Sequence, residues 1–137
     1  MSLIDKIAWI QVDDGAILST RSAGRDVYYL PGGKREPGES DLETLVREIR
    51  EELSVAIVAG SQTHVGTFEA QAHAHPAGTV VRMTCYTADF HGELRADNEI
   101  EEVARLTYAD RDRVSPVDQL VFDELYRTGL LRADSTT

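Results

Sequence analysis

The sequence predicts a mixed fold of strands and helices, of the α/β or α+β class. Helical patterns occur once in mid-sequence and once near the end, while most of the remaining chain consists of short β-branched or alternating runs separated by glycine- and proline-containing turns. With 137 residues and 42% hydrophobic content, the chain can bury one core. No break in composition marks a second unit, so we expect one domain over residues 1–137.

The first third of the chain is expected to be mostly strand. Residues 6–12 and 16–20 are predicted to form a hairpin around a tight turn at residues 13–15. Residues 27–30 are predicted as a short strand that runs into a flexible loop at Gly32 and Gly33.

The mid-sequence helix has both a start signal and a buried stripe. Ser40 and Glu43 have the S-x-x-E spacing of a capping box, directly after a turn at residues 37–39. The apolar residues that follow recur at helical spacing and predict the face that docks on the core: Leu42, Leu45, Val46, Ile49 and Leu53.

The second half is predicted to contain more strands and a terminal helix. The predicted strands cover residues 55–58, a long hairpin at 64–71 and 79–90, and residues 103–108 after an acidic stretch. Ser115 is expected to cap the last helix, with Pro116 at its first position and Gly129 as its stop. Its buried stripe is predicted to be Leu120, Val121 and Leu125.

Three carboxylates share one face of the mid-sequence helix. At about 100° per residue, Glu48, Glu51 and Glu52 fall within an arc of roughly 100°. Like charges at i,i+4 repel, and hard oxygen ligands on a rigid element suit Mg²⁺ or Mn²⁺, which completes its shell with water and phosphate oxygens. An acidic helix face is more often simply solvated. The spacing around the helix favours a metal site here.

That spacing is regular. Five residues separate Gly33 from Glu39 and seven separate Glu39 from Arg47; then come Glu48, Ile49, one residue, Glu51, Glu52, one residue, Ser54 and Val55. The pattern closely resembles the signature of the Nudix hydrolases, G-x5-E-x7-R-E-U-x-E-E-x-G-U, where U is a bulky aliphatic residue. Every fixed position matches except the last glycine, which is Ser54 here. Six fixed identities at set spacing make this a specific signal.

The resemblance implies a fold and a set of roles. The family fold is an α/β/α sandwich with a curved mixed β-sheet flanked by helices. By resemblance, Glu48, Glu51 and Glu52 bind Mg²⁺ or Mn²⁺ with the Gly33 carbonyl, and Arg47 pairs with Glu39 as structural support, for which the planar guanidinium fork is suited. Ser54 must either adopt a strained left-handed conformation, at a cost of about 1 kcal/mol, or end the helix differently. We expect a small effect on stability and retained metal binding.

The implied chemistry is hydrolysis of a diphosphate linkage. The metal ions would bridge phosphoryl oxygens and lower the pKa of a bound water, which attacks one phosphorus in line and releases a nucleoside monophosphate. Glu51 and Glu52 are the expected catalytic carboxylates on the helix. Glu99 is the candidate from outside it, with Glu102 in reserve, although a solvated acidic loop is the alternative for both.

The formal charge of −10 restricts the partners. It argues against long nucleic acid, whose binding depends on Lys and Arg neutralising phosphates. The phosphates of a small nucleotide would instead meet metal ions and, among the cations near the glycine loop, Arg21, Arg25, Lys34 and Arg35. No apolar run approaches a membrane span and residues 1–5 do not resemble a signal peptide, so a cytoplasmic protein is expected. A homodimer is plausible by resemblance.

The substrate is left open by the sequence. Within the family that the chain resembles, the proline that many ADP-ribose hydrolases carry about fifteen residues after the motif has no match here, which makes ADP-ribose less favoured. Residues 18–22 are only faintly similar to the upstream motif of coenzyme A hydrolases and lie too close to the glycine loop. Nucleoside triphosphates are therefore the default. Candidate aromatic side chains for stacking on a base, most of them expected in the core, are Trp9, Tyr28, Tyr29, Phe68 and Tyr86. Cys85 is read as a strand side chain, and the four histidines are assigned to loops or strand ends. The alternative function is a catalytically idle Nudix-fold module that binds or senses a nucleotide.

Overall fold

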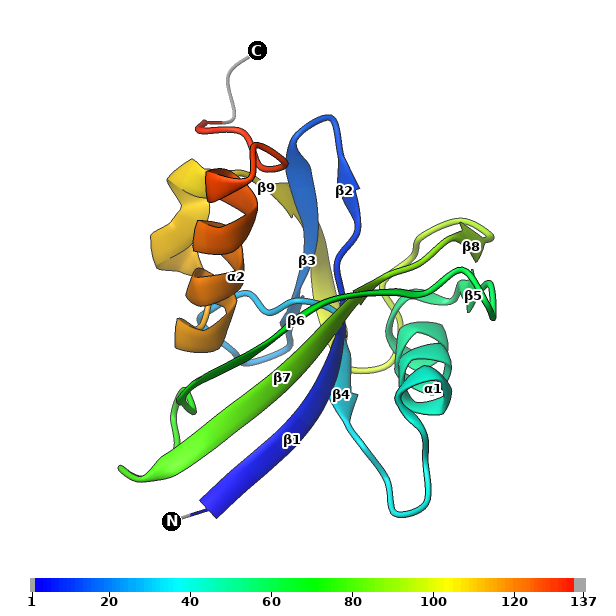
Figure 1. Cartoon of the computed structure of the whole chain (residues 1–137), viewed down its shortest axis with the longest axis horizontal. Coiled ribbons are helices and arrows are strands. Elements are labelled where there is room, and N and C mark those ends of the chain that lie inside the picture. The colour runs from blue at the N-terminus through cyan, green and yellow to red at the C-terminus, as the bar shows by residue number, and fades with distance from the viewer. Residues whose placement is uncertain (1, 135–137) are drawn as a thin grey trace.

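The computed structural model describes residues 2–134 and places two helices on opposite sides of a set of strands (Figure 1). The ends of the domain expected over residues 1–137 therefore lie outside the described residues. The strands are β1 (Ser2–Trp9), β2 (Val12–Asp13), β3 (Ala16–Ser22), β4 (Gly32–Lys34), β5 (Ala56–Ile57), β6 (Thr63–Gln71), β7 (Thr79–Thr87), β8 (Phe90–His91) and β9 (Ile100–Leu106). The helices are α1 (Asp41–Leu53), the 3₁₀ helix η1 (Tyr108–Arg113) and α2 (Pro116–Arg127).

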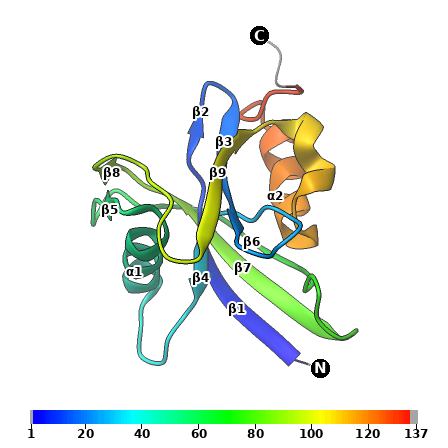
Figure 2. The same ribbon diagram turned by 180° about the vertical axis from the view of Figure 1, so that it is seen from behind.

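Within residues 2–134, the strands form one mixed sheet and two smaller sheets. The largest sheet has the order β4-β1-β7-β6, in which β1 runs parallel to β7 and antiparallel to β4. A second sheet has the order β2-β3-β9, with β9 beside β3 in the view from behind (Figure 2). The short strands β5 and β8 pair with each other. The expected α/β sandwich with a curved mixed sheet is confirmed.

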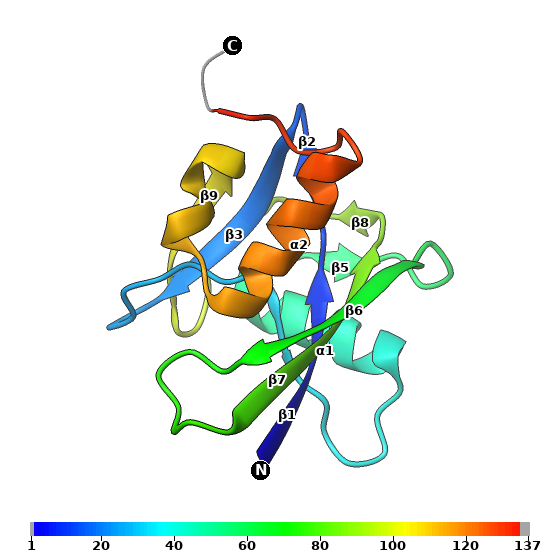
Figure 3. The ribbon, with the colours of Figure 1, turned by 60° about the vertical axis from the view of Figure 1, so that its left-hand side comes forward.

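The alternating faces of β1 divide the core into two halves. Ile7 and Trp9 belong to the apolar cluster under α1, whereas Ala8 and Ile10 belong to the cluster under α2. Successive strand residues point to opposite faces, so a strand covered on both sides is apolar at nearly every position. In Figure 3, α2 lies in front of the strands and α1 behind them.

Helix α1 follows its sequence signals closely. The Ser40 hydroxyl accepts a hydrogen bond from the Glu43 N–H, and the Glu43 carboxylate accepts one from the Ser40 N–H, so the predicted capping box is present. Leu45, Ile49 and Leu53 are fully buried, and Leu42 and Val46 pack at the edge of the same cluster. The helix is therefore fixed against β1, with its acidic face left beside β4.

The predictions for the first third of the chain are partly wrong. Strand β1 ends at Trp9 and pairs with β4 and β7, so only the short β2 forms a hairpin with β3. Residues 27–30 are not a strand, because Tyr28 and Tyr29 make only isolated bridges. The strand comes later, at Gly32–Lys34, where pairing with β1 overrides the poor strand propensity of glycine.

The second half matches better, with three corrections. The long hairpin is confirmed as β6 and β7, but residues 90–91 form the separate strand β8. Strand β9 begins at Ile100 and so includes part of the acidic stretch. In α2, Leu120 is 38% exposed and does not join the buried stripe, which contains Val117, Val121 and Leu125. Pro116 begins α2 as predicted, and Gly129, with φ +83°, follows its end. Within residues 2–134, no helix has the length and apolar character needed to span a membrane.

Candidate active site

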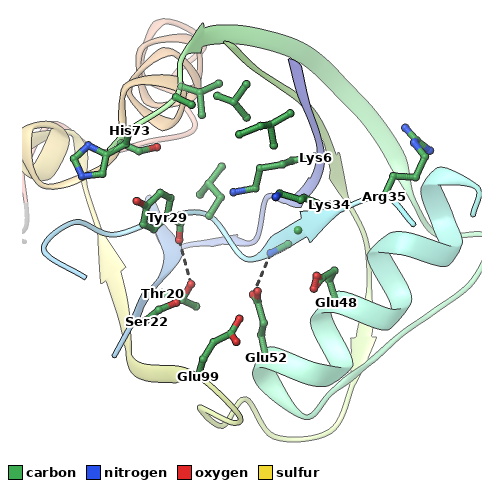
Figure 4. Close-up of a pocket in the computed structure, with 18 of the residues that line it drawn as sticks. Lys6, Thr20, Ser22, Tyr29, Lys34, Arg35, Glu48, Glu52, His73 and Glu99 are labelled. Carbon is green, nitrogen blue, oxygen red and sulfur yellow. Dashed lines mark hydrogen bonds between the residues drawn. The ribbon is translucent and has the colours of Figure 1, made fainter. Parts of the chain in front are cut away.

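A pocket of about 740 Å³ lies between α1, β4, β1 and the start of α2 (Figure 4). Its acidic end is lined by Glu48 and Glu52 from α1 and by Glu99, the residue before β9. Its other end is lined by Tyr29, His73 and Val117 together with polar groups. The volume is in the range of small-molecule sites and is large enough for a nucleotide.

Glu48 is seated against Gly33. In the antiparallel pairing of β4 with β1, Gly33 is opposite Ile7, whose side chain packs under α1. A Cβ at Gly33 would point the same way and lie 2.7 Å from Glu48 Oε1, and closer still to Oε2 and Cδ. The Glu48 side chain is only 14% exposed, and burial raises its pKa. The missing side chain at Gly33 is thus the space that the Glu48 carboxylate occupies.

Glu52 is held by the neighbouring glycine. The Gly32 N–H donates a hydrogen bond to Glu52 Oε1 at 3.1 Å. Burial raises the pKa of Glu52 to about 8, against the opposing effect of the Gly32 N–H, and the Glu48 charge adds to the rise. A buried carboxylate with one hydrogen bond is costly to ionise unless a cation joins it.

Glu51 has a different position. Its side chain is 50% exposed with Oε1 3.5 Å from Arg47 Nη1, and it lies outside the lining of the large pocket. Consistent with this, no group of three or more His, Cys, Asp or Glu side chains in residues 2–134 is gathered in a metal-binding arrangement. The assignment of Glu51 as a ligand and catalytic residue stays a prediction.

The residues at the acidic end nevertheless suit a divalent metal. The carboxylates of Glu48 and Glu52 supply two oxygen ligands from α1, packed against the backbone of Gly33 and Gly32. Because both carboxylates are largely buried, ionising the two together is unfavourable unless a cation binds between them. Hard carboxylate and carbonyl oxygens are the donors that Mg²⁺ and Mn²⁺ prefer. The donor set therefore fits, with the remaining coordination positions left to water and phosphate.

Arg47 and Glu39 form the expected ion pair. Arg47 Nε and Nη2 donate to the two Glu39 oxygens at 2.7 and 2.9 Å, a bidentate pair. Arg47 Nη2 also donates to the Lys34 carbonyl at 3.1 Å, and Thr44 Oγ1 donates to Glu39 at 2.9 Å. The Arg47 guanidinium is the main cause that lowers the pKa of Glu39 to about 2. The pair ties the loop after β4 to α1.

Glu99 reaches the pocket because its loop is bound to the end of α1. The Asp97 N–H donates to the Glu52 carbonyl at 3.0 Å, and Asn98 Nδ2 donates to the Glu51 carbonyl at 2.6 Å. Helix carbonyls without an intrahelical partner need such donors. Figure 4 shows the Glu99 carboxylate directed into the pocket beside Glu52.

Ser54 takes part in this attachment. It adopts the left-handed conformation, with φ 61° and ψ 27°, so the strained alternative is the one found. Its hydroxyl donates to Asp97 Oδ2 at 2.8 Å and lowers the pKa of that carboxyl. The reserve candidate Glu102 lies elsewhere, on β9, where Arg21 Nε is 3.3 Å from its Oε1.

The four predicted phosphate cations divide into two kinds. Arg21 pairs with Glu101 and Glu102 and lies outside the pocket lining. Arg35 lines the pocket, but its guanidinium pairs with Asp5 and Asp41. Arg25 and Lys34 also line the pocket. Only these last two therefore remain candidates without a carboxylate partner among residues 2–134.

Three pocket or near-pocket groups were missed by sequence reasoning. Lys6 projects from β1 into the pocket, and its Nζ lies 5.4 Å from the centre of the Tyr29 ring. His73 lines the far end and pairs with Asp26 at 3.2 Å. Asp118, 1% exposed, accepts a hydrogen bond from Ser115 Oγ at 2.6 Å beneath the same end, and burial raises its pKa to about 6. Of these three residues, only Lys6 could have been singled out from the sequence, because the chain has just one other lysine, Lys34, beside the glycine loop.

Most of the aromatic candidates belong to the core, as expected. Trp9 is fully buried and donates to the Ala88 carbonyl, Tyr28 is buried, and Phe68 packs against the core. Of the five, only Tyr29 lines the pocket. Cys85 is buried in β7, as predicted, and burial raises the pKa of its thiol.

Comparisons with known proteins agree with this geometry. The NUDIX domain family matches residues 5–125. The CTP pyrophosphohydrolase of Escherichia coli K12 is 37% identical over 101 residues, which is 70% of each chain. An RNA pyrophosphohydrolase of Halorhodospira halophila is 46% identical over 43 residues, covering 31% of this chain and 24% of that protein.

Solved structures have the same fold. The E. coli ORF135 protein superposes with a TM-score of 0.74 at 28% identity, covering 94% of this chain and 92% of that one. A MutT NUDIX hydrolase from Burkholderia pseudomallei gives a TM-score of 0.72 at 22% identity, covering 91% and 99%. Hydrolases of this family generally use divalent metal ions. The chain belongs to the Nudix hydrolase family and is a pyrophosphohydrolase that acts on nucleotide derivatives.

Proposed function

We propose that this chain, as a single domain, hydrolyses a nucleoside triphosphate with Mg²⁺ or Mn²⁺ and releases a nucleoside monophosphate and pyrophosphate. The observation that carries the proposal is a single pocket with two chemically different ends. One end is lined by the carboxylates of Glu48 and Glu52, and the other by the rings of Tyr29 and His73. The first end suits a metal-bound phosphate chain and the second suits a nucleoside.

The acidic end would hold the metal. Glu48, Glu52 and the Gly33 carbonyl are the proposed ligands, with Glu51 as a further ligand and catalytic residue once its side chain turns toward the helix face that it shares with them. A bound divalent ion supplies neutralisation of phosphate charge and acidification of water. Arg47 and Glu39 keep β4 and α1 in register, so that the two carboxylates are positioned before substrate arrives.

Glu99 is the proposed base. Its carboxylate is directed to the pocket space beside Glu52 and is exposed, so it is available to a water molecule. It would accept the proton of the water that attacks phosphorus, while Glu52 and Glu48 would hold the metal. The anchoring of the Asp97–Asn98 segment to α1 supports this role because it fixes where Glu99 points.

The far end would bind the nucleoside. Tyr29 and His73 meet edge to face, with ring centres 6.4 Å apart, and Val117 adds an apolar wall. CTP is the first substrate to test because a relative at 37% identity is a CTP pyrophosphohydrolase. We further propose a cytoplasmic protein with no long nucleic acid partner, and a homodimer, which a light-scattering mass would test.

The experiment is pyrophosphate release from a panel of nucleoside triphosphates, led by CTP, with Mg²⁺, Mn²⁺ or EDTA. We expect metal-dependent release by the parent and at least a 100-fold lower rate for Glu52→Gln. If the parent and Glu52→Gln are equally inactive on every nucleotide while one nucleotide binds tightly, the chain is instead an idle nucleotide-binding module.

A further inference from the structure

The chain uses its two lysines in a single place. It has twelve arginines and only two lysines, Lys6 and Lys34. They are direct partners in the antiparallel pairing of β1 with β4, and both line the pocket. Directly paired residues of two antiparallel strands lie on the same face of the sheet, where two like charges destabilise the pairing. Such a pair calls for an anion.

No carboxylate of the described residues supplies that anion by direct contact. Neither ammonium forms an ion pair with a side chain within residues 2–134, in contrast to Arg35 and Arg47, which line the same pocket. The contact found for Lys6 is the face of the Tyr29 ring, 5.4 Å from Nζ to the ring centre. A ring face leaves the three donors of an ammonium group free for a ligand.

The location of Lys6 in the pocket determines which part of a bound nucleotide it can contact. In Figure 4 its ammonium lies between the carboxylates of Glu48 and Glu52 and the ring of Tyr29. It acts electrostatically on Glu48 and Glu52 at one side and on Asp118 at the other, partly opposing the rise that burial causes in the pKa of each. Lys6 is therefore at the junction of the acidic end and the nucleoside end.

We propose that Lys6 binds the phosphate that joins the nucleoside to the rest of the substrate, and that this contact positions the nucleotide along the pocket. The proposal rests on the proposed function. A compact ammonium with three donors suits a tetrahedral phosphate as a point charge. The phosphates farther along the chain are left to the metal end and to Lys34, which is more exposed.

If Lys6 binds this phosphate, it should contact the nucleoside monophosphate product as well as the substrate. A nucleoside monophosphate keeps the phosphate that Lys6 binds, so it should compete with substrate through Lys6 even without metal. The free nucleoside lacks that phosphate, and its binding should not depend on Lys6. The difference between these two ligands isolates the contact from any general effect on the pocket.

The first test compares Lys6→Met with Lys6→Arg and with Arg105→Met, which removes the same charge outside the pocket lining. A lost charge-assisted hydrogen bond lowers affinity about 10- to 100-fold. We expect this loss for inhibition by CMP in Lys6→Met, with no change for cytidine and no loss of Mn²⁺ affinity in calorimetry, because a positive charge near Glu48 and Glu52 has been removed. Lys6→Arg should recover part of the affinity, and Arg105→Met should match the parent.

The second test does not need turnover. An amine-reactive label modifies the side chains of Lys6 and Lys34, and peptide mass spectrometry reads each one separately. We expect CMP to slow the labelling of Lys6 more than that of Lys34, and cytidine to leave both unchanged. Equal labelling of Lys6 with and without millimolar CMP would overturn the proposal, even if the parent hydrolyses CTP. Protection by CMP in a parent that hydrolyses no nucleotide would instead sustain the Lys6 contact and overturn the proposed function.

Discussion

Replacing Gly33 with alanine should separate the site from the fold. The added Cβ would lie 2.7 Å from Glu48 Oε1 and closer to Oε2, so the carboxylate has to move by about 1 Å or more to regain van der Waals distance. The Gly33 carbonyl, the proposed ligand on β4, is kept. The substitution therefore displaces one ligand without removing any.

The cost to folding should be small. The backbone of Gly33 is not among the glycines with positive φ, so alanine is allowed there and gains about 0.4–1 kcal/mol by restricting the unfolded chain. An off-rotamer Glu48 side chain costs about 0.5–1.5 kcal/mol in return. The two contributions nearly cancel, and the free energy of unfolding should stay within about 1 kcal/mol of the parent.

The cost to catalysis should be large. A 1 Å displacement of a catalytic group lowers rate by about 100-fold. The measurement is kcat/KM for CTP hydrolysis with Mg²⁺, beside urea unfolding and Mn²⁺ calorimetry. Gly66→Ala is the matched control, since its Cβ would meet only the Phe68 ring at 3.3 Å. If Gly33→Ala keeps the parent's rate and metal affinity, Glu48 does not hold the metal in this position.

Three other changes test neighbouring parts of the structure. Without metal at pH 7, Glu52→Gln should be as stable as the parent, because burial raises the pKa of Glu52 to about 8 and its carboxyl is then mostly neutral, like an amide. Added Mn²⁺ should stabilise Glu52→Gln less than the parent, and an equal gain in stability would contradict the role of Glu52 as a ligand. Ser54→Ala keeps the left-handed backbone but loses the hydrogen bond to Asp97, whereas Ser54→Gly relieves the backbone, so alanine should be the less stable variant by about 1 kcal/mol in urea unfolding. Asp118 has a pKa raised from 3.8 to about 6, which means that the folded state favours its protonated form; its contribution is present below about pH 4 and declines by up to about 3 kcal/mol as the pH rises from about 4 through 6. Asp118→Asn should therefore gain stability relative to the parent between pH 4 and pH 8, and a difference that does not change with pH would refute the assignment.

The helix at the centre of the site was predictable because its signals are local. The capping box at Ser40 and Glu43, the stripe through Ile49, and the pairing of Arg47 with Glu39 all lie within a few turns of one another along the chain. Helix periodicity and capping depend on near neighbours, so sequence alone is sufficient to place them.

The position of β4 was not predictable in the same way. Tyr28 and Tyr29 have higher strand propensity than Gly32 and Gly33, and the sequence therefore favoured a strand at residues 27–30. Pairing with β1, which is distant in sequence, places the strand at the glycines instead. The register of that pairing decides which side chains face the pocket, and no local pattern carries it.

Asp118 was missed for a related reason. An acid in the first turn of a helix is ordinarily a solvated group that favours the helix dipole. At 100° per residue it falls between Val121 and Phe122 on the buried side, and the Leu120 assigned to that side falls outside it. The apolar residues alone were counted in predicting the stripe, so a buried carboxylate on it could not be found.

The three residues of β4 explain why glycines precede the acidic helix. The Gly32 N–H points to Glu52 and accounts for its position, while the missing side chain at Gly33 makes room for Glu48. One residue later the strand places Lys34 opposite Lys6 on the other face. Strand alternation thus assigns the Glu48 carboxylate to one side of β4 and the ammonium groups to the other. A phosphate chain that crosses the glycines would meet both, which requires a strand with almost no side chains at that point.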